Sequence, residues 1–373
     1  MRRDFPRGIA WNQMPARSAI VSKADPLWIV GYVPASVATE RKEVPLTGRI
    51  GLIGRQTAVH ADLVQASIAK SDAAHSALVA SWRRSLQLHH LDPAERKAPR
   101  RLTEGELRGA RQRMERMIRA AETSLNRLYQ AVGGVGCCVM LADRDGIPVE
   151  RRGAVADDET FDEWGLWTGT VWSEDSEGTN GIGTCLADQR ALTIHRDQHF
   201  FSRNTLLSCT TAPVYDHEGN LAAALDVSSC RSDLTEGFVQ LISVAVGDAA
   251  RRIEAENFRM VYSNARILLA PVAERGAGAL IAVDQDDLVI GATRSARLAL
   301  GITGEALARG LLAADVLGDQ AKAKEDLDDA ERGALQRAMA RAGGNVSAAA
   351  QNLGISRATL HRKLARFEIR RPH

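Results

Sequence analysis

The residues best suited to do chemistry lie at the end of the chain, where cations gather on a short segment that can neutralise phosphate. From Ile355 onward there are six arginine or lysine residues and one acidic residue, Glu368, in a chain of 373 residues whose formal net charge is +2. Such a concentration on one small unit is an electrostatic footprint for nucleic acid. The alternative is a solvated basic helix. The segment is therefore a candidate nucleic-acid interface.

The pattern before this segment predicts two short helices. Residues 328–341 carry apolar residues at helical spacing, and Gly343-Gly344 ends that helix. Residues 347–353 predict a second, very short helix with an alanine face. Gly354 follows it and can adopt the positive φ of a helix end.

A third helix carries the cations. Ser356 can cap residues 357–367, in which Leu360 and Leu364 face inward at i, i+4. Two short helices joined by a glycine-containing turn are typical of the DNA-reading helix-turn-helix.

The stretch GGNVSAAAQNLGISRATLHRKLARFEI resembles the DNA-binding end of the Fis family. Domains of this kind usually form the C-terminal end of bacterial transcriptional regulators. The resemblance implies a double-stranded DNA operator as partner. It places seven residues at the DNA, with Ser347 at a phosphate and most of the others toward the major groove: Ser347, Ser356, Arg357, Thr359, His361, Arg362 and Lys363. Arg357, at the helix start, can make a bidentate contact to guanine.

Composition bounds the rest of the chain. With 45% hydrophobic and 25% charged residues, it is an ordinary soluble protein. The stretch Pro26–Val37 is too short and interrupted for a membrane span, and it lacks a signal-peptide cleavage pattern. The cysteines are odd in number and include no CxxC, so neither a disulfide framework nor a zinc ribbon is indicated: Cys137, Cys138, Cys185, Cys209 and Cys230. We expect a cytoplasmic protein with no membrane contact and no cofactor.

The middle of the chain predicts an α+β sensor fold. Thr103 and Glu106 form a capping box, followed by a long helix with one apolar stripe, which is either a dimer seam or core packing: Leu107, Ala110, Met114, Met117, Ala121, Leu125, Leu128 and Val132. Short strands follow at residues 136–141, 192–194, 209–215 and 221–228, and then a helix from Thr235 to Met260.

The stretches EGTNGIGTCLADQRALTIHRDQHFF and SCTTAPVYDHEGNLAAALDVSS, with SWRRS upstream, resemble the GAF domain of acetoin-catabolism-regulator-like transcription factors. Most such proteins carry an AAA+ ATPase between the sensor and the helix-turn-helix. This chain contains no Gly-Lys pair and hence no GxxxxGK[ST] loop. We therefore expect a member of this group that lacks the ATPase domain and is not an enzyme.

A GAF sheet with helices on one face is expected to enclose a small organic effector on the other face, under the irregular middle segment. The predicted ligand-binding residues are Trp164, Trp167, Trp172, Thr179, Asn180, His199, Phe200, Cys209 and Thr211. Alternatively, the tryptophans are lid core and the glycines only turns. His195, His199, Cys185 and Cys209 match no recognised metal site, and no metal is predicted.

Taken together, these features predict a ligand-responsive transcriptional regulator that acts as a homodimer and has RNA polymerase as a partner. The alternative is a thiol redox sensor or enzyme that uses Cys209 or Cys185 and carries a DNA-binding tail. The expected organisation is a poorly ordered extension 1–60, a helical region 61–120, the GAF sensor 121–260, a PAS-like segment 264–310, a connector 311–326 and the all-α helix-turn-helix 327–373.

Overall fold

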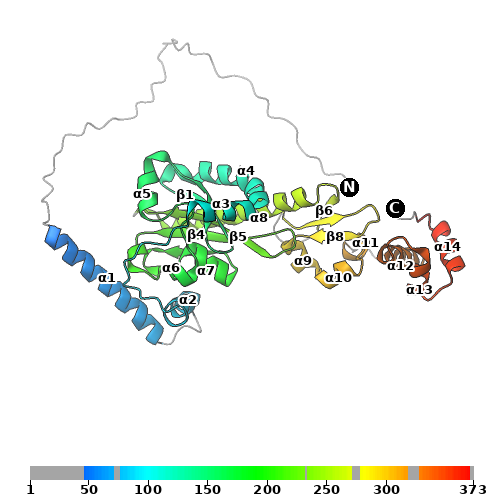
Figure 1. Cartoon of the computed structure of the whole chain (residues 1–373), viewed down its shortest axis with the longest axis horizontal. Helices are drawn as coiled ribbons and strands as arrows, with labels where there is room; N and C mark the ends of the chain where they lie inside the picture. The colour runs from blue at the N-terminus through cyan, green and yellow to red at the C-terminus, as the bar shows by residue number, and fades with distance from the viewer. Residues whose placement is uncertain (1–45, 71–75, 232, 271–277, 318–326, 370–373) are drawn as a thin grey trace, which may run out of the picture. The chain divides into compact units, whose positions relative to one another are not determined.

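The computed structural model describes residues 46–70, 76–231, 233–270, 278–317 and 327–369 (Figure 1). Residues Ile50–His373 form one compact unit. Among the described residues, no helix is long and apolar enough to cross a membrane.

A five-stranded antiparallel sheet forms the centre of the sensor. Its strands are β1 Cys138–Asp143, β2 Pro148–Arg152, β3 Leu192–His195, β4 Ser208–Tyr215 and β5 Leu221–Ser229, in the order β2-β1-β5-β4-β3. A tight turn at residues 143–147 joins β1 and β2. Asp143 accepts hydrogen bonds from the backbone N–H groups of Asp145 and Ile147, and Gly146 has a φ of +78°.

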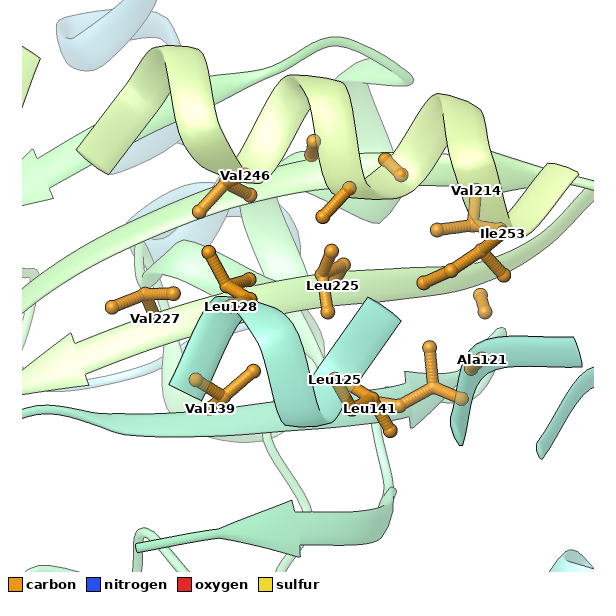
Figure 2. Close-up of a cluster of buried hydrophobic side chains, with 14 of the residues drawn as sticks. Ala121, Leu125, Leu128, Val139, Leu141, Val214, Leu225, Val227, Val246 and Ile253 are labelled. Carbon is orange, nitrogen blue, oxygen red and sulfur yellow. The ribbon is translucent and has the colours of Figure 1, made fainter. Parts of the chain in front are cut away.

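Two long helices, α4 Glu115–Val132 and α8 Glu236–Val261, cover one face of this sheet. Figure 2 shows Leu125 and Leu128 of α4 and Ile253 of α8 pointing into a core with Leu141 and Leu225 of the sheet. The apolar stripe predicted from the sequence lies largely in this core: Ala110, Met114, Met117, Ala121, Leu125, Leu128 and Val132. Of the two interpretations of the stripe, core packing is the one observed.

The predicted long helix is broken in two. The capping box of Thr103 and Glu106 starts α3 Glu104–Arg113 as expected. Met114 then leaves helical geometry, with φ −95° and ψ 2°, and α4 begins at Glu115. The expectation of one continuous helix was wrong. Met114 is nevertheless buried, so the break lets both helices keep their apolar sides on one core.

The opposite face carries the short helices α5 Asp158–Glu163, α6 Glu174–Glu177 and α7 Gly181–Asp188. Farther out, α1 Leu46–Ala69 and α2 Ala77–Arg83 pack on the same side, where Trp82 and Val64 bury Phe200 and Phe201. Helical structure therefore begins at Leu46, earlier than the predicted residue 61. Residues 1–45 lie outside the described part of the chain.

Two smaller units follow the sensor. The first is a three-stranded sheet of β6 Arg266–Leu269, β7 Leu280–Val283 and β8 Val289–Ala292, with α9 Arg294–Leu300, α10 Gly304–Ala308 and α11 Ala313–Leu317. Ala313 belongs to its core, so part of the predicted connector 311–326 is folded here. The second unit consists of α12 Leu327–Arg341, α13 Val346–Asn352 and α14 Arg357–Arg366.

Candidate DNA interface and sensor face

The last three helices are shaped by the turns and caps that the sequence predicts. Gly343, Gly344 and Gly354 all have positive φ values. Ser356 caps α14, because its hydroxyl accepts from the backbone N–H of Thr359 at 3.1 Å. The core between the helices buries eight apolar side chains: Leu335, Ala338, Met339, Val346, Ala349, Ala350, Leu360 and Leu364.

The cap of α13 is Asn345, two residues before the predicted phosphate contact Ser347. The Asn345 side chain accepts from the backbone N–H groups of Ser347 and Ala348 at 3.0 and 3.2 Å. The Ser347 hydroxyl is left at an exposed helix start, where backbone dipoles favour an anion.

The residues predicted to contact DNA at α14 differ in exposure and in whether they have an intramolecular partner. Arg357 and Arg362 are exposed, and neither makes an ion pair or hydrogen bond with any described residue. Ser356 is exposed, and Thr359 and His361 are half-buried. Lys363, in contrast, is held by Glu331 of α12. It serves the packing of α14 on α12, whereas the two free arginines are available to a partner.

A second intramolecular pair strengthens the same packing. Arg366 bonds both carboxylate oxygens of Asp328 at 2.6 and 2.8 Å. Part of the positive charge counted from the sequence is therefore neutralised within the unit. Arg370 and Arg371, which belong to that count, lie outside the described residues.

The sensor sheet brings polar residues together on the face that α5 to α7 cover. The strand register aligns Arg151, Met140, Asp226 and Thr211 as successive cross-strand neighbours. Cross-strand partners point to the same side of a sheet. One row of side chains therefore runs from a cation on β2 to a carboxylate on β5 and a hydroxyl on β4.

Asp226 is the central acid of this face and is completely buried. The Thr211 hydroxyl donates to Oδ1 at 2.5 Å, and the Ser228 hydroxyl donates to Oδ2 at 2.6 Å. Burial raises the pKa of Asp226 to about 6, against the two hydrogen bonds that lower it.

His199 and Cys209 form a buried pair beside that acid. Nδ1 of His199 donates to the carbonyl oxygen of Arg196 at 2.9 Å, so Nε2 is the acceptor that faces Sγ of Cys209 at 3.4 Å. Burial lowers the pKa of His199 to about 4 and raises that of Cys209 above its usual range. Both groups are neutral near pH 7, and the thiol keeps its proton.

The same holds for Cys185, whose pKa is raised by burial and by the nearby Asp226 carboxylate. A reactive thiol needs a lowered pKa and access to solvent. Neither cysteine of the redox alternative has these properties. Among the described residues, no three His, Cys, Asp or Glu side chains are placed to hold a metal.

The glycine-rich stretch before α7 sits directly on these buried groups. A Cβ on Gly181 would lie 2.6 Å from both Cys209 Cβ and Thr211 Oγ1, and 3.0 Å from Asp226 Oδ1. Asn180 caps α7, accepting from Gly183 N–H and donating to the Gly178 carbonyl, both at 2.8 Å. The predicted ligand-binding residue Asn180 therefore has a structural role that occupies its amide.

Thr179 belongs to a second polar cluster, in which α2 holds this loop in place. Its hydroxyl lies 2.7 Å from the Ser81 hydroxyl, which also donates to Glu174. Arg84 bonds Glu174 at 2.8 Å and Asp188 at 2.8 Å. The SWRRS segment thus fastens the N-terminal helices to the covering loops of the sensor.

The tryptophans form a third group. Trp172 is buried, and its Nε1 donates to the carbonyl of Gly165 at 2.8 Å. Trp164 is half-buried against the same core. Trp167 is half-buried and stacks on Arg151, whose guanidinium carbon lies 4.3 Å from the ring centroid. Phe200 lies apart from all three tryptophans, in the core with Trp82.

Several residues of the site were not identified from the sequence. Asp226 is the single charged residue of the strand Leu221–Ser229, a signal that was present but not used, whereas Arg151 stands between Glu150 and Arg152 and is not distinguished by the sequence. Ser81 and Glu174 gave no comparable signal, because their contact joins elements 93 residues apart.

Comparisons with known proteins agree with this architecture. The family model described as "GAF domain" matches residues 116–253, and that described as "Bacterial regulatory protein, Fis family" matches residues 326–367. The predicted fold class and the predicted pair of domains are thereby confirmed. The GAF match begins and ends several residues before the predicted range 121–260.

Two curated relatives are transcription regulators by name. The acetoin catabolism regulatory protein of Cupriavidus necator is 35% identical over 232 residues, which cover 61% of this chain and 35% of that protein. The acetoin dehydrogenase operon transcriptional activator AcoR of Bacillus subtilis is 26% identical over 46% of this chain and 28% of that protein. The chain thus matches about a third of these relatives' length.

Among solved structures, the Escherichia coli DhaR(N)-DhaL complex covers 61% of this chain and 76% of its own matched chain, at 16% identity and a TM-score of 0.44.

Proposed function

We propose that this chain of a GAF domain and a Fis-type helix-turn-helix is a DNA-binding transcriptional regulator that responds to a small organic effector. The observation that carries the proposal is the pair Arg357 and Arg362 on α14. Both are exposed and unpaired among the described residues, in a unit that matches the Fis family. An arginine at the start of a recognition helix can form two hydrogen bonds to guanine in the major groove.

The test is a comparison of two arginine variants. DNA fragments selected by the full chain from a random pool define the operator, and gel shifts then measure binding to operator and to scrambled DNA. Arg357→Ala is expected to lose about 1–3 kcal/mol of discrimination between the two. Arg332→Ala, which removes an exposed charge from α12, is the matched control and is expected to keep the discrimination. Equal behaviour of the two variants contradicts the role of α14.

The regulator is proposed to act as a homodimer, since two recognition helices on half-sites one helical turn apart multiply a specificity that one short helix cannot reach alone. The apolar stripe of α3 and α4 is used in the core of each chain, so it does not form the dimer contact. Light scattering measures the oligomeric state, and a two-fold symmetric footprint checks its consequence on DNA.

The effector is proposed to act on the face of the GAF sheet that α5 to α7 cover. Support comes from Arg151 on this face, since buried polar groups are normally paired, whereas its buried Nε and Nη2 have no partner among the described residues. Cys209, Thr211 and His199 lie together in this region, and the predicted ligand-binding residue Trp167 lies beside Arg151. The proposal includes RNA polymerase as a partner and a cytoplasmic location, because a regulator of bacterial transcription acts on the polymerase in that compartment.

A further inference from the structure

Arg151 of β2 has a buried guanidinium with one unpartnered edge. Its side chain is only 10% exposed, and Nη1 donates to Asp158 Oδ1 at 2.8 Å. Nε and Nη2 are also buried, yet they donate to no atom of the described residues. An unpaired buried donor costs more free energy than a hydrogen bond returns, and a charged donor costs more than a neutral one. A purely structural residue at this position would not be expected to carry two of them.

Two other arginines of the described residues also have a buried, unpartnered guanidinium nitrogen, but they differ from Arg151. Arg83 and Arg203 each have one buried donor without a partner, Nε, and Arg203 is neutralised by Glu177 at 2.6 Å. In Arg151 the two free donors belong to the same edge. Two parallel N–H groups in one plane match the two oxygens of a carboxylate.

The surroundings of Arg151 hold this edge in a fixed direction. Its guanidinium carbon lies 4.3 Å from the ring centroid of Trp167 and 5.3 Å from that of Phe161. A Cβ on Gly153 would lie 2.5 Å from Nη2, so a glycine is needed there to leave the guanidinium in place. The guanidinium is therefore held beside two aromatic rings and Gly153, and Nε and Nη2 are its buried donors without a partner among the described residues.

The Nε–Nη2 edge of Arg151 lies on the same face of the sensor sheet as Asp226. Arg151 is the cross-strand neighbour of Met140, which in turn pairs with Asp226. Strands lie about 4.8 Å apart, so Arg151 and Asp226 stand roughly 10 Å apart on the same face. The guanidinium thus marks one end of the face for which we propose effector binding.

We propose that Arg151 recognises the anionic group of the effector, and that this effector is a small organic acid whose carboxylate binds the Nε–Nη2 edge beside Trp167. The inference rests on the proposed effector response of the GAF domain, but it can be tested without DNA. The aromatic rings and Met140 suit an organic body. A phosphate dianion would need more donors than the two that this edge offers.

The experiment uses the full-length chain and matched pairs of probes, benzoate with benzamide and butyrate with butyramide. Calorimetry measures the dissociation constants, and tryptophan fluorescence follows the thermal midpoint. Each carboxylate is expected to bind at least about tenfold more tightly than its amide, since a hydrogen bond to a charged group is worth more than a neutral one.

Arg151→Gln is expected to remove this preference, and Arg151→Lys to restore only part of it, because an ammonium cannot form the fork. Arg152→Gln is the matched control. Arg152 is the next residue of the strand, its side chain is directed to the other face, and it pairs with Glu150. If Arg151→Gln fails to fold, Gly153→Ala replaces it, since this change keeps the charge and displaces the guanidinium. Gly153→Ala is then expected to weaken carboxylate binding at least about tenfold.

Three results overturn the inference: equal affinity for carboxylates and amides, equal loss in Arg151→Gln and Arg152→Gln, or no response to any carboxylate at millimolar concentration. Inorganic phosphate that binds as tightly as the carboxylates refutes the organic acid. Operator discrimination is measured separately. Its failure, with carboxylate binding intact, refutes the proposed regulator and leaves Arg151 as an anion site.

Discussion

Replacement of Asp226 by Asn tests whether the sensor face holds an acid that destabilises the fold when it is ionised. Asp226 is completely buried on β5 and receives hydrogen bonds from Thr211 and Ser228. It has no ion pair among the described residues. Burial raises its pKa from 3.8 to about 6. Asparagine keeps the shape and removes the ionisation.

The dependence of stability on pH follows from the raised pKa of Asp226. Because the folded protein holds the proton more tightly than the unfolded chain, the stabilisation is fully present below about pH 4 and is lost as the pH rises through about 6. The difference between 3.8 and about 6 corresponds to about 3 kcal/mol. The free energy of unfolding of the wild type should therefore fall by about this amount, relative to Asp226→Asn, as the pH rises to 8.

Denaturant unfolding followed by tryptophan fluorescence measures this difference. The six tryptophans all lie before residue 173, so the signal reports no unfolding of the helix-turn-helix. Glu177 and Glu254, whose pKa values burial raises to about 7, titrate in both proteins and cancel in the comparison. Asp145→Asn, at an exposed turn, is the control. A difference between wild type and Asp226→Asn that stays constant with pH would refute the reasoning.

Other predictions follow from packing and from the contacts of α2. Gly181→Ala should lower the thermal midpoint of the sensor, because its Cβ would meet Cys209 and Thr211, whereas Gly105→Ala, with open space around it, should raise the stability of α3 by up to about 1 kcal/mol; equal midpoints would contradict this. Leu125→Ala should cost about 2–5 kcal/mol of unfolding free energy in denaturant titrations, and the exposed Leu206→Ala less than about 0.5. Arg84→Ala should speed limited proteolysis near α2, since it removes the ion pairs to Glu174 and Asp188; an unchanged cleavage rate would show that these ion pairs do not hold α2 in place. Purified protein should hydrolyse no ATP above a heat-killed control, because the sequence holds no phosphate-binding loop.

Local patterns were sufficient for the helix-turn-helix. The stops at Gly343 and Gly354, the cap at Ser356 and the inward Leu360 and Leu364 are all found where the sequence predicts them. Each of these features depends on residues within one or two helical turns, so the chain specifies them locally. The intramolecular pair of Lys363 and Glu331 was missed, because it joins residues 32 positions apart.

The sensor was predictable in its elements but less so in its buried contacts. Alternating strands and the stripe of α4 predicted four of the five strands and the helical cover, whereas β2 was not predicted. The break at Met114 was missed, since the apolar spacing continues through it. The contact between the hydroxyls of Ser81 in α2 and Thr179 was missed as well, because a hydroxyl pair between residues far apart in the sequence has no periodic signature.

The strand register explains why the polar groups of the sensor face are hard to recognise in the sequence and clear in the structure. Arg151, Asp226 and Thr211 come from three strands. In the sequence Arg151 stands between Glu150 and Arg152 and Thr211 follows Thr210, so neither is distinguished from its neighbours there. Pairing β2 with β1, and β5 with β1 and β4, places all three on one face. A register shift of one residue would move them to the helical face, against α4 and α8, where unpaired charges are costly. The same register that buries the apolar side chains of β1 and β5 against α4 and α8 thus fixes the charged groups on the opposite face.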